Sequence, residues 1–414
     1  MATVSQLDGR SEVPASVERY TCRTIDGIDA ISGLEASWPG LDREAPAEIV
    51  GPEWRGPMAS FGWALAAATA LAEEQTPRVV TASDGDGILR AVAPLAQSGR
   101  RSAARLEMLG VRRLNEPADF VFTDRASFDA LVDGMLRLRR PLLLGRLPAQ
   151  SPTIEALRRA CRGRAVVVVR PQASCPFIPL DESWLTPENH LSSRRRSDFR
   201  RALRRAERHG DVRAEVLTPA PEHLDGLLQI AFDIEARSWK GAAGTALACD
   251  PLRGGHLRQF AHWASRAGTL RIALLWIGRE PIAMQIATEE AGRWWLLKIG
   301  FDPAWSDCSP GTLLLAETLR HAVRQQLTSY EFLGTVENWT QVWTDHEHEC
   351  VSVRVYPFNL NGAALLATDA FAIARRRISQ SRLCHWLRRS GIRENSGAPP
   401  DDNSVLTNPA TTKS

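Results

Sequence analysis

The chain has 414 residues, of which 44% are hydrophobic and 24% are charged, and its formal net charge is +3. This is the composition of a soluble globular protein long enough for two domains, and the small net charge argues against nucleic-acid binding over a broad surface. Seven cysteines without a C-x-x-C pair are typical of reduced thiols, and no apolar run approaches the roughly 20 residues that span a bilayer, so we expect a cytoplasmic protein without a transmembrane segment.

In the first half of the chain, short apolar runs alternate with segments of helical periodicity. Over 124–139, for example, Phe128, Leu131 and Met135 recur at helical spacing and form one apolar side. The elements expected here are strand 18–25, helices 28–38 and 57–74, strands 78–83, 89–95 and 105–109, helix 124–139, strand 142–144, helix 153–162 and strand 165–170.

The second half repeats this order of elements. Its clearest local signal is a hairpin around the turn sequence Gly-Arg-Glu-Pro at 278–281. The elements expected here are helix 197–209, strand 212–217, helices 221–239 and 252–267, strands 270–277, 282–288 and 294–299, helix 309–327, strand 330–333, helix 338–343, strand 350–356 and one or two helices over 361–390.

The repeated order predicts an α/β protein of two tandem domains, each a mixed sheet flanked by helices. We place an N-terminal domain at 17–175, a C-terminal domain at 176–360, closing helices at 361–390 and a disordered tail at 391–414, because the tail is rich in Pro, Asn, Asp, Ser and Thr. Only the second half has a loop of small residues before its long helix. We therefore expect the N-terminal domain to be non-catalytic.

That loop lies in the stretch 293–338, which combines a buried strand, a long helix and a second strand. Ser309 and Pro310 have the residue types that cap and open a helix, and Gly311 lets another group approach the backbone closely. A helix N-terminus after a strand presents unpaired N–H groups and the positive end of the helix dipole. The stretch therefore predicts a phosphate-binding loop, although an ordinary helix start uses the same residue types.

Lysine is rare in this chain, which has 48 arginines and only three lysines, Lys240, Lys298 and Lys413. A coding bias toward arginine is the simplest cause. Lysine is a compact cation whose pKa can change on burial, and arginine is neither. We therefore expect Lys240 and Lys298 to lie where arginine does not fit, whereas Lys413 belongs to the tail.

The second half resembles the GNAT acyltransferase superfamily. It is most similar to the acetyltransferase domain of cellulose-biosynthesis-associated (CelD/BcsL-type) proteins and to tandem-GNAT relatives of the Fem-type aminoacyl transferases. The resemblance rests on four ordered motifs, Arg-Arg-Ala-Glu-Arg-His-Gly at 204–210, Ser-Trp-Lys-Gly-Ala-Ala-Gly-Thr-Ala at 238–246, Lys-Ile-Gly-Phe-Asp-Pro…Ser-Pro-Gly-Thr-Leu-Leu at 298–314 and Tyr-Glu-Phe-Leu-Gly-Thr…Asn-Trp-Thr-Gln-Val-Trp at 330–343.

The resemblance implies that acetyl-CoA or another acyl-CoA lies where the fourth and fifth strands of the second half splay apart, and we expect no metal. The pyrophosphate would lie on the loop before the helix, at Ser306, Ser309, Pro310, Gly311 and Thr312.

The implied chemistry is attack of a neutral amine on the thioester, with a carboxylate taking the proton. Glu235 and Glu331 are the candidate bases. Lys298 is a further candidate catalytic residue that would neutralise a phosphate or a substrate carboxylate. The alternative for Lys298 is an ion pair with Glu331 on the neighbouring strand.

Trp239 and Lys240 are predicted to line the acceptor side, where they would supply an aromatic wall and a charge. Trp339 is a further candidate. Relatives commonly carry Tyr-Lys at positions 339–340, where this chain has Trp-Thr. The expected acceptor is a small-molecule or sugar amine, such as an amino sugar or a precursor of an envelope polysaccharide.

Three other interpretations remain open. The eight arginines between Arg194 and Arg208 favour a solvated helix face, but they would contact RNA if the protein were a Fem-type aminoacyl-tRNA-dependent transferase. His346, His348 and Cys350 alternate as they would on one face of a strand, a weak sign of zinc. Both halves could also form a non-catalytic scaffold of polysaccharide assembly.

Overall fold

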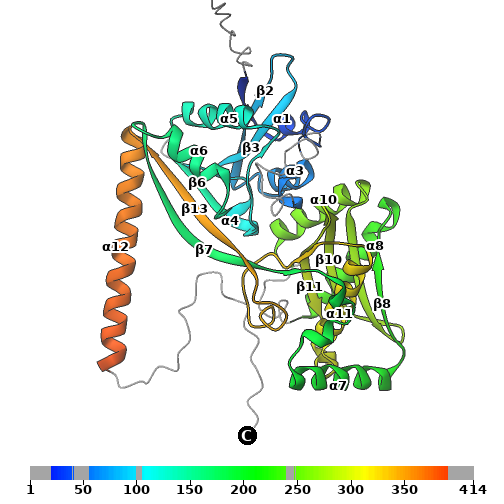
Figure 1. Cartoon of the computed structure of the whole chain (residues 1–414). Helices are drawn as coiled ribbons and strands as arrows, with labels where there is room; N and C mark the ends of the chain where they lie inside the picture. Colours follow the sequence, from blue (N-terminus) through cyan, green and yellow to red (C-terminus); the bar gives the residue numbers. More distant parts are fainter. Residues whose placement is uncertain are drawn as a thin grey trace, which may run out of the picture.

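A computed structural model describes residues 20–39, 41, 56–98, 105–238, 247 and 249–389, with the side chains of 30 and 376–389 left out. The expected disordered segment 391–414 lies outside these residues. The chain forms a mixed α/β structure, which confirms the predicted fold class, and its strands join in one sheet with helices on both faces (Figure 1). The strand order is β1-β2-β3-β4-β6-β13-β7-β12-β11-β10-β9-β8, with β5 paired to β3.

The N-terminal half supplies one end of this sheet. Its α5 helix begins after Asp124, whose side chain accepts a hydrogen bond from the Ser127 amide at 2.8 Å, and it buries Phe128, Leu131 and Met135 against the sheet. The elements of this half are β1 (Thr21–Asp26), α1 (Ile28–Ser32), α3 (Phe61–Ala70), β2 (Gln75–Ser83), β3 (Leu89–Ser98), β4 (Leu106–Met108), α4 (Val111–Leu114), β5 (Val121–Phe122), α5 (Arg125–Arg137), β6 (Leu142–Pro148) and α6 (Pro152–Ala160).

The C-terminal half supplies the other end, and its helices divide between the two faces. Helices α7 and α11 pack on one face through a core that contains Phe199, Leu315 and Leu319, and α8 and α10 pack on the other through a core that contains Leu228 and Phe260. The elements are α7 (Ser193–His209), β8 (Val212–Leu217), α8 (Leu224–Arg237), α10 (Pro251–Arg266), β9 (Leu270–Ile277), β10 (Glu280–Glu290), β11 (Arg293–Phe301), η6 (Pro303–Cys308), α11 (Pro310–Arg324) and β12 (Ser329–Glu331).

Two long strands join the halves. β7 (Ala165–Pro179) pairs with β13 (Glu347–Pro357) over most of its length and then with β12 through Phe177, Ile178 and Pro179. β13, although late in the sequence, lies between β6 and β7 of the N-terminal half. The predicted domain boundary at 175/176 therefore falls inside β7, and the predicted strand 165–170 is extended by nine residues up to Pro179.

The closing segment is a single helix, α12 (Leu360–Arg389), where one or two helices were expected. It extends from the N-terminal half, on the opposite side of the molecule from α8 (Figure 1). Searching the described residues finds no helix with both the length and the apolar character that crossing a bilayer requires.

Helices α3 and α10 pack against each other across the two halves. Gly62 of α3 is required for this contact, because a Cβ atom at that position would lie only 2.1 Å from the indole of Trp263. Trp63 and Phe260 stack edge to face nearby, with ring centroids 5.0 Å apart. The N-terminal half thus covers the same face of the C-terminal sheet as α8 and α10.

Candidate active site

The fourth and fifth strands of the C-terminal half, β11 and β12, run side by side only briefly. Their parallel pairing covers Arg293, Trp294 and Trp295 of β11, after which β12 ends at Glu331 and β11 continues to Phe301. The chain leaves β12 through Leu333 and Gly334, which both have left-handed backbone conformations with φ of 57° and 54°. Along the described chain, the second part of β11 therefore has a strand partner only on its β10 side.

A β-bulge in β11 determines which side chains face this divergence. Ile286 of β10 pairs with Lys298 and the next residue, Ala287, pairs with Leu296, so Leu297 is the extra residue. After the bulge, Ile299 and Phe301 pack in the core beneath α11. Because side chains alternate along a strand, Lys298 and Gly300 point to the opposite face, which α8 covers.

Glu235 of α8 lies directly over β11 on that face. A Cβ atom at Gly300 would be 3.3 Å from the Cα of Glu235, so glycine permits this close approach. The Glu235 side chain is buried, and its Oε2 accepts a hydrogen bond from the Leu247 amide at 2.9 Å. Glu235 thus lies beside the diverging strands and also binds the backbone at Leu247. The predicted substrate residues Trp239 and Lys240 lie outside the described residues.

Lys298 is half-buried on the α8 face and forms no hydrogen bond or ion pair with any residue that the structure describes. The charge of Lys298 affects the pKa of His256 on α10. Burial lowers the pKa of His256 to about 3, and the positive charge of Lys298 acts in the same direction. The alternative pairing of Lys298 with Glu331 is wrong, because Glu331 pairs with Arg293.

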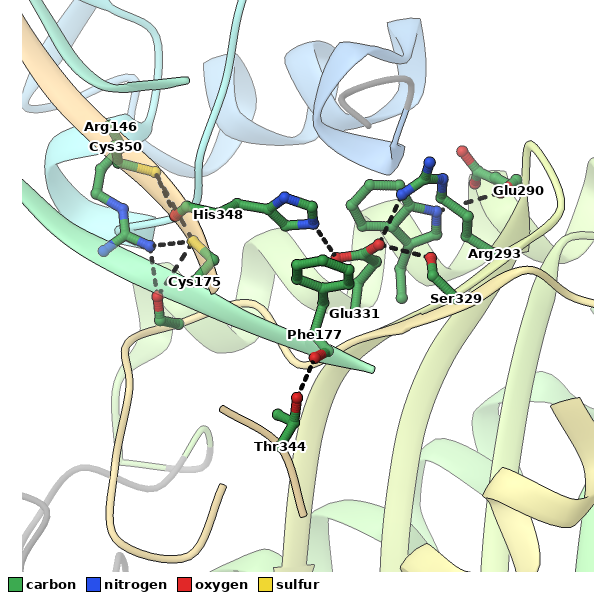
Figure 2. Close-up of polar contacts among 12 residues, drawn as sticks. Arg146, Cys175, Phe177, Glu290, Arg293, Ser329, Glu331, Thr344, His348 and Cys350 are labelled. Carbon is green, nitrogen blue, oxygen red and sulfur yellow. Dashed lines mark hydrogen bonds and ion pairs between the residues drawn. The ribbon is translucent and has the colours of Figure 1, made fainter. Parts of the chain in front are cut away.

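Glu331 lies in a buried polar network instead (Figure 2). Its Oε1 accepts hydrogen bonds from Arg293 at 2.8 Å and from Ser329 at 2.6 Å, and its Oε2 lies 3.0 Å from the Nε2 of His348. The His348 ring stacks on Phe177 with centroids 3.9 Å apart. Both oxygens are engaged, so Glu331 ties β11, β12 and β13 together, and a role in proton transfer would run through His348.

His348 was considered from sequence only as a metal ligand, and Arg293 gave no functional signal. A register shift between His348 and Cys350 interrupts the expected alternation of that strand. Within the described residues, no group of three His, Cys, Asp or Glu side chains is arranged to hold a metal ion.

The loop before α11 carries the predicted cofactor residues. The Ser309 carbonyl accepts from the amides of Thr312 at 3.0 Å and Leu313 at 3.2 Å, and Pro310 has no N–H. The Gly311 amide donates to no acceptor in the part of the chain that the structure describes. Ser309 takes the N-cap position, but its side chain makes no capping hydrogen bond and its φ is 46°. Ser306 and Ser309 are exposed, so the N-terminus of α11 is accessible.

The arginine-rich helix α7 contacts this loop. The Arg205 guanidinium donates to the carbonyl oxygen of Asp307 at 3.1 Å, and the ring of His209 meets Trp305 edge-on at 5.3 Å. Phe199, Ala202 and Ala206 are buried, while the arginines are exposed except Arg196. The helix face is solvated, as expected, and one end of it adds positive charge beside the N-terminus of α11.

Trp339 lies in the turns after β12. It is 37% exposed, its ring meets Phe332 edge-on at 5.5 Å, and its Nε1 donates to Glu337 at 2.8 Å. Phe332 directly follows the last residue of β12, so Trp339 lies on the β12 side of the divergence. The nearby Tyr330 lies in the same core as Phe332, with ring centroids 5.2 Å apart, and its hydroxyl donates to Gln285 at 2.9 Å.

Comparison with known proteins agrees with this geometry. Residues 193–341 match the family model described as an acetyltransferase (GNAT) domain. The C-terminal half has the GNAT acetyltransferase fold. The matched segment begins at α7 and includes the bulge in β11, the loop before α11, β12 and Trp339. No curated protein matches the chain.

Solved structures of low sequence identity match much of the chain. FemX is 11% identical with a TM-score of 0.51, over 78% of this chain and 96% of that one. A conserved protein of unknown function from Bacteroides thetaiotaomicron VPI-5482 is 10% identical with a TM-score of 0.49, over 77% and 96%. A tandem GNAT protein from the clavulanic acid biosynthesis pathway is 14% identical with a TM-score of 0.40, over 81% and 98%.

Proposed function

We propose that the C-terminal half transfers an acyl group from acetyl-CoA or another acyl-CoA to an amine. The observation that carries this proposal is the divergence of β11 from β12 next to a helix N-terminus whose Gly311 amide has no acceptor among the described residues. A free amide at the positive end of a helix dipole suits a phosphate oxygen. Arg205 adds a cation beside it.

In the proposed reaction the acceptor's neutral nitrogen attacks the thioester carbonyl. A C–N bond forms, the C–S bond breaks, the nitrogen loses a proton and coenzyme A leaves as the thiol. Glu235, which lies over Gly300 of β11, is a candidate to receive the proton, through water where needed. Glu331 is the less direct candidate, because His348, Arg293 and Ser329 engage both of its oxygens.

Calorimetric titration with CoA tests the cofactor. We expect binding to the unmodified protein and a loss of at least about tenfold in affinity in Gly311→Glu, which places a carboxylate against the pyrophosphate. Gly226→Glu is the matched control, since Gly226 is exposed on α8 and a Cβ atom there meets open space. Absence of binding at millimolar CoA would refute the proposal.

A Fem-type reaction with aminoacyl-tRNA is the second candidate, supported by the exposed arginines of α7. It predicts RNA binding that falls steeply with salt and that survives Gly311→Glu. The relation to cellulose biosynthesis and a scaffold role in polysaccharide assembly rest on the sequence resemblance alone. Protection of the β11–α11 region from hydrogen exchange by CoA would separate an enzyme from a scaffold.

A further inference from the structure

The N-terminal half reaches the end of β12 with two charged side chains. Oε2 of Glu116 accepts a hydrogen bond from the Gly334 amide at 3.2 Å, and the Arg146 guanidinium donates to the Gly334 carbonyl. Gly334 is the residue at which the chain turns away from β12, with a φ of 54°. Glu116 is therefore fixed where the chain leaves β12, beside the divergence of β12 from β11.

The second oxygen of Glu116 remains open. Within the described chain, Oε1 accepts no hydrogen bond, and the residue is only half-buried. Desolvation raises the pKa of Glu116, while the charges of Arg146, Lys298 and Arg253 act to lower it. Glu116 is thus an incompletely solvated carboxylate with one oxygen that no described group engages.

Lys298 lies on the opposite wall, on β11 just after the bulge. Its charge reaches both Glu116 and His256, yet no ion pair joins it to either residue. A half-buried ammonium without a partner carries a desolvation cost that an anionic ligand would offset. The two walls thus present an ammonium and a carboxylate oxygen that act on each other electrostatically but form no ion pair.

Three cations act on Glu116. Arg253 pairs with Asp250 at 3.6 Å and Arg146 donates to the Gly334 carbonyl, so the cation left for a negatively charged ligand beside the Glu116 carboxylate is Lys298. The open oxygen of that carboxylate suits an N–H donor.

We propose that the acceptor is an amine that also carries a carboxylate or a phosphate, with Lys298 binding the anionic group and Glu116 binding the amine. This inference rests on the proposed acyl transfer and makes the N-terminal half part of the site. A purely structural role for Glu116 explains its bond to Gly334 but leaves Lys298 without a function.

Binding is measured by saturation-transfer difference NMR on the full chain saturated with CoA. The probes are glucosamine 6-phosphate against glucosamine, and alanine against alaninamide, so that each pair differs in its anionic group. We expect the anionic member of at least one pair to bind about tenfold or more tightly than its neutral partner, and the pair that responds identifies phosphate or carboxylate. Equal binding within both pairs, or no binding of any probe, overturns the proposal.

Two variants assign the contacts. Lys298→Met should abolish the preference for the anionic probe while the neutral amine still binds. Glu116→Gln should weaken both members of a pair, because it removes the negative charge that binds the amine. Its amide oxygen can still accept from Gly334, so the local structure should be kept. Arg279→Met, in the exposed turn before β10, is the control. Retention of the preference in Lys298→Met overturns the assignment. Repeating the NMR without CoA distinguishes the two proposals. Calorimetry alone decides whether CoA binds, and its failure would refute the acyl transfer. The preference for the anionic amine is then measured independently of CoA.

Discussion

The carboxylate of Glu116 accepts a hydrogen bond from the Gly334 amide at 3.2 Å, across 218 residues of sequence. Arg146 holds the carbonyl of the same glycine, so both backbone groups of Gly334 are bound by the N-terminal half. The end of β12, and with it the divergence from β11, therefore depends on contacts from outside the GNAT-like segment. We expect changes in the N-terminal half to alter reactions at the C-terminal site.

Arg293→Met should destabilise the fold strongly. The change leaves Glu331, which is 2% exposed, without its cationic partner, and breaking one side of a buried ion pair costs about 3–5 kcal/mol. Urea denaturation measures the loss. Arg293→Met combined with Glu331→Gln should recover part of it, and Arg170→Met, at an exposed position of β7, should change stability little. A cost below about 1 kcal/mol for Arg293→Met would show that the network contributes little to folding.

His256 should make the protein less stable as the medium becomes acidic. Burial lowers the pKa of its ring from 6.5 to about 3 in the folded chain, so between these values the unfolded chain binds a proton that the folded chain does not. Stability is therefore lost as pH falls below the unfolded value, by roughly 4–5 kcal/mol once the folded pKa is reached.

Chemical denaturation of the unmodified protein and of His256→Gln between pH 7 and pH 3 tests this. Other groups titrate in the same range, so the informative quantity is the difference in unfolding free energy between the two proteins. That difference should shift in favour of the variant as pH falls. A difference that stays constant with pH would contradict the buried neutral ring.

Arg205→Gln should weaken CoA binding by about three- to tenfold at low ionic strength, because the variant removes a cation next to the N-terminus of α11. Raising the salt concentration should reduce the effect. Calorimetry provides the comparison, with Arg201→Gln on the same helix as the control. An unchanged affinity would mean that Arg205 serves only to attach α7 to the loop through Asp307.

Cys175 and Cys350 should form a disulfide under oxidation by diamide, which accepts the two thiol hydrogens. Their sulfur atoms lie 3.9 Å apart on β7 and β13, and both residues are 2% exposed, so the reaction should be slow (Figure 2). Mass spectrometry should find the loss of two hydrogens and a peptide that joins the two strands. Cys350→Ser should remove this product, and a pairing that involves exposed Cys249 instead would contradict the expectation.

The sequence predicted the elements whose signals are local. The apolar run at 294–299, the helix after Ser309 and the strand at 330–333 correspond to β11, α11 and β12. A strand buried on both faces requires a continuous apolar run, and a helix packed on one face requires helical periodicity. The end of β7 was missed, since Arg170, Pro171 and Gln172 do not resemble a buried strand. Pairing of β13 between β6 and β7 joins residues such as Leu147 and Val351, and no local pattern encodes such a contact.

Only some residues of the candidate site carry a signal in the local sequence. The loop at Gly311 carries a local signature, and the scarcity of lysine singled out Lys298. The face on which Lys298 lies depends on a bulge that only the pairing of β10 with β11 defines. Glu116 follows a short helix in a stretch without periodicity, and its importance comes entirely from Gly334 and Lys298, which are distant in sequence.

The position of β13 has a consequence for how the chain folds during synthesis. Ribosomes deliver the N-terminal half first, yet the strand that fills the space between β6 and β7 emerges only near the end of translation. Until then both strands expose unpaired edges, which favour association with other chains. We expect nascent or truncated forms that end before Glu347 to depend on chaperones, however well their local helices form.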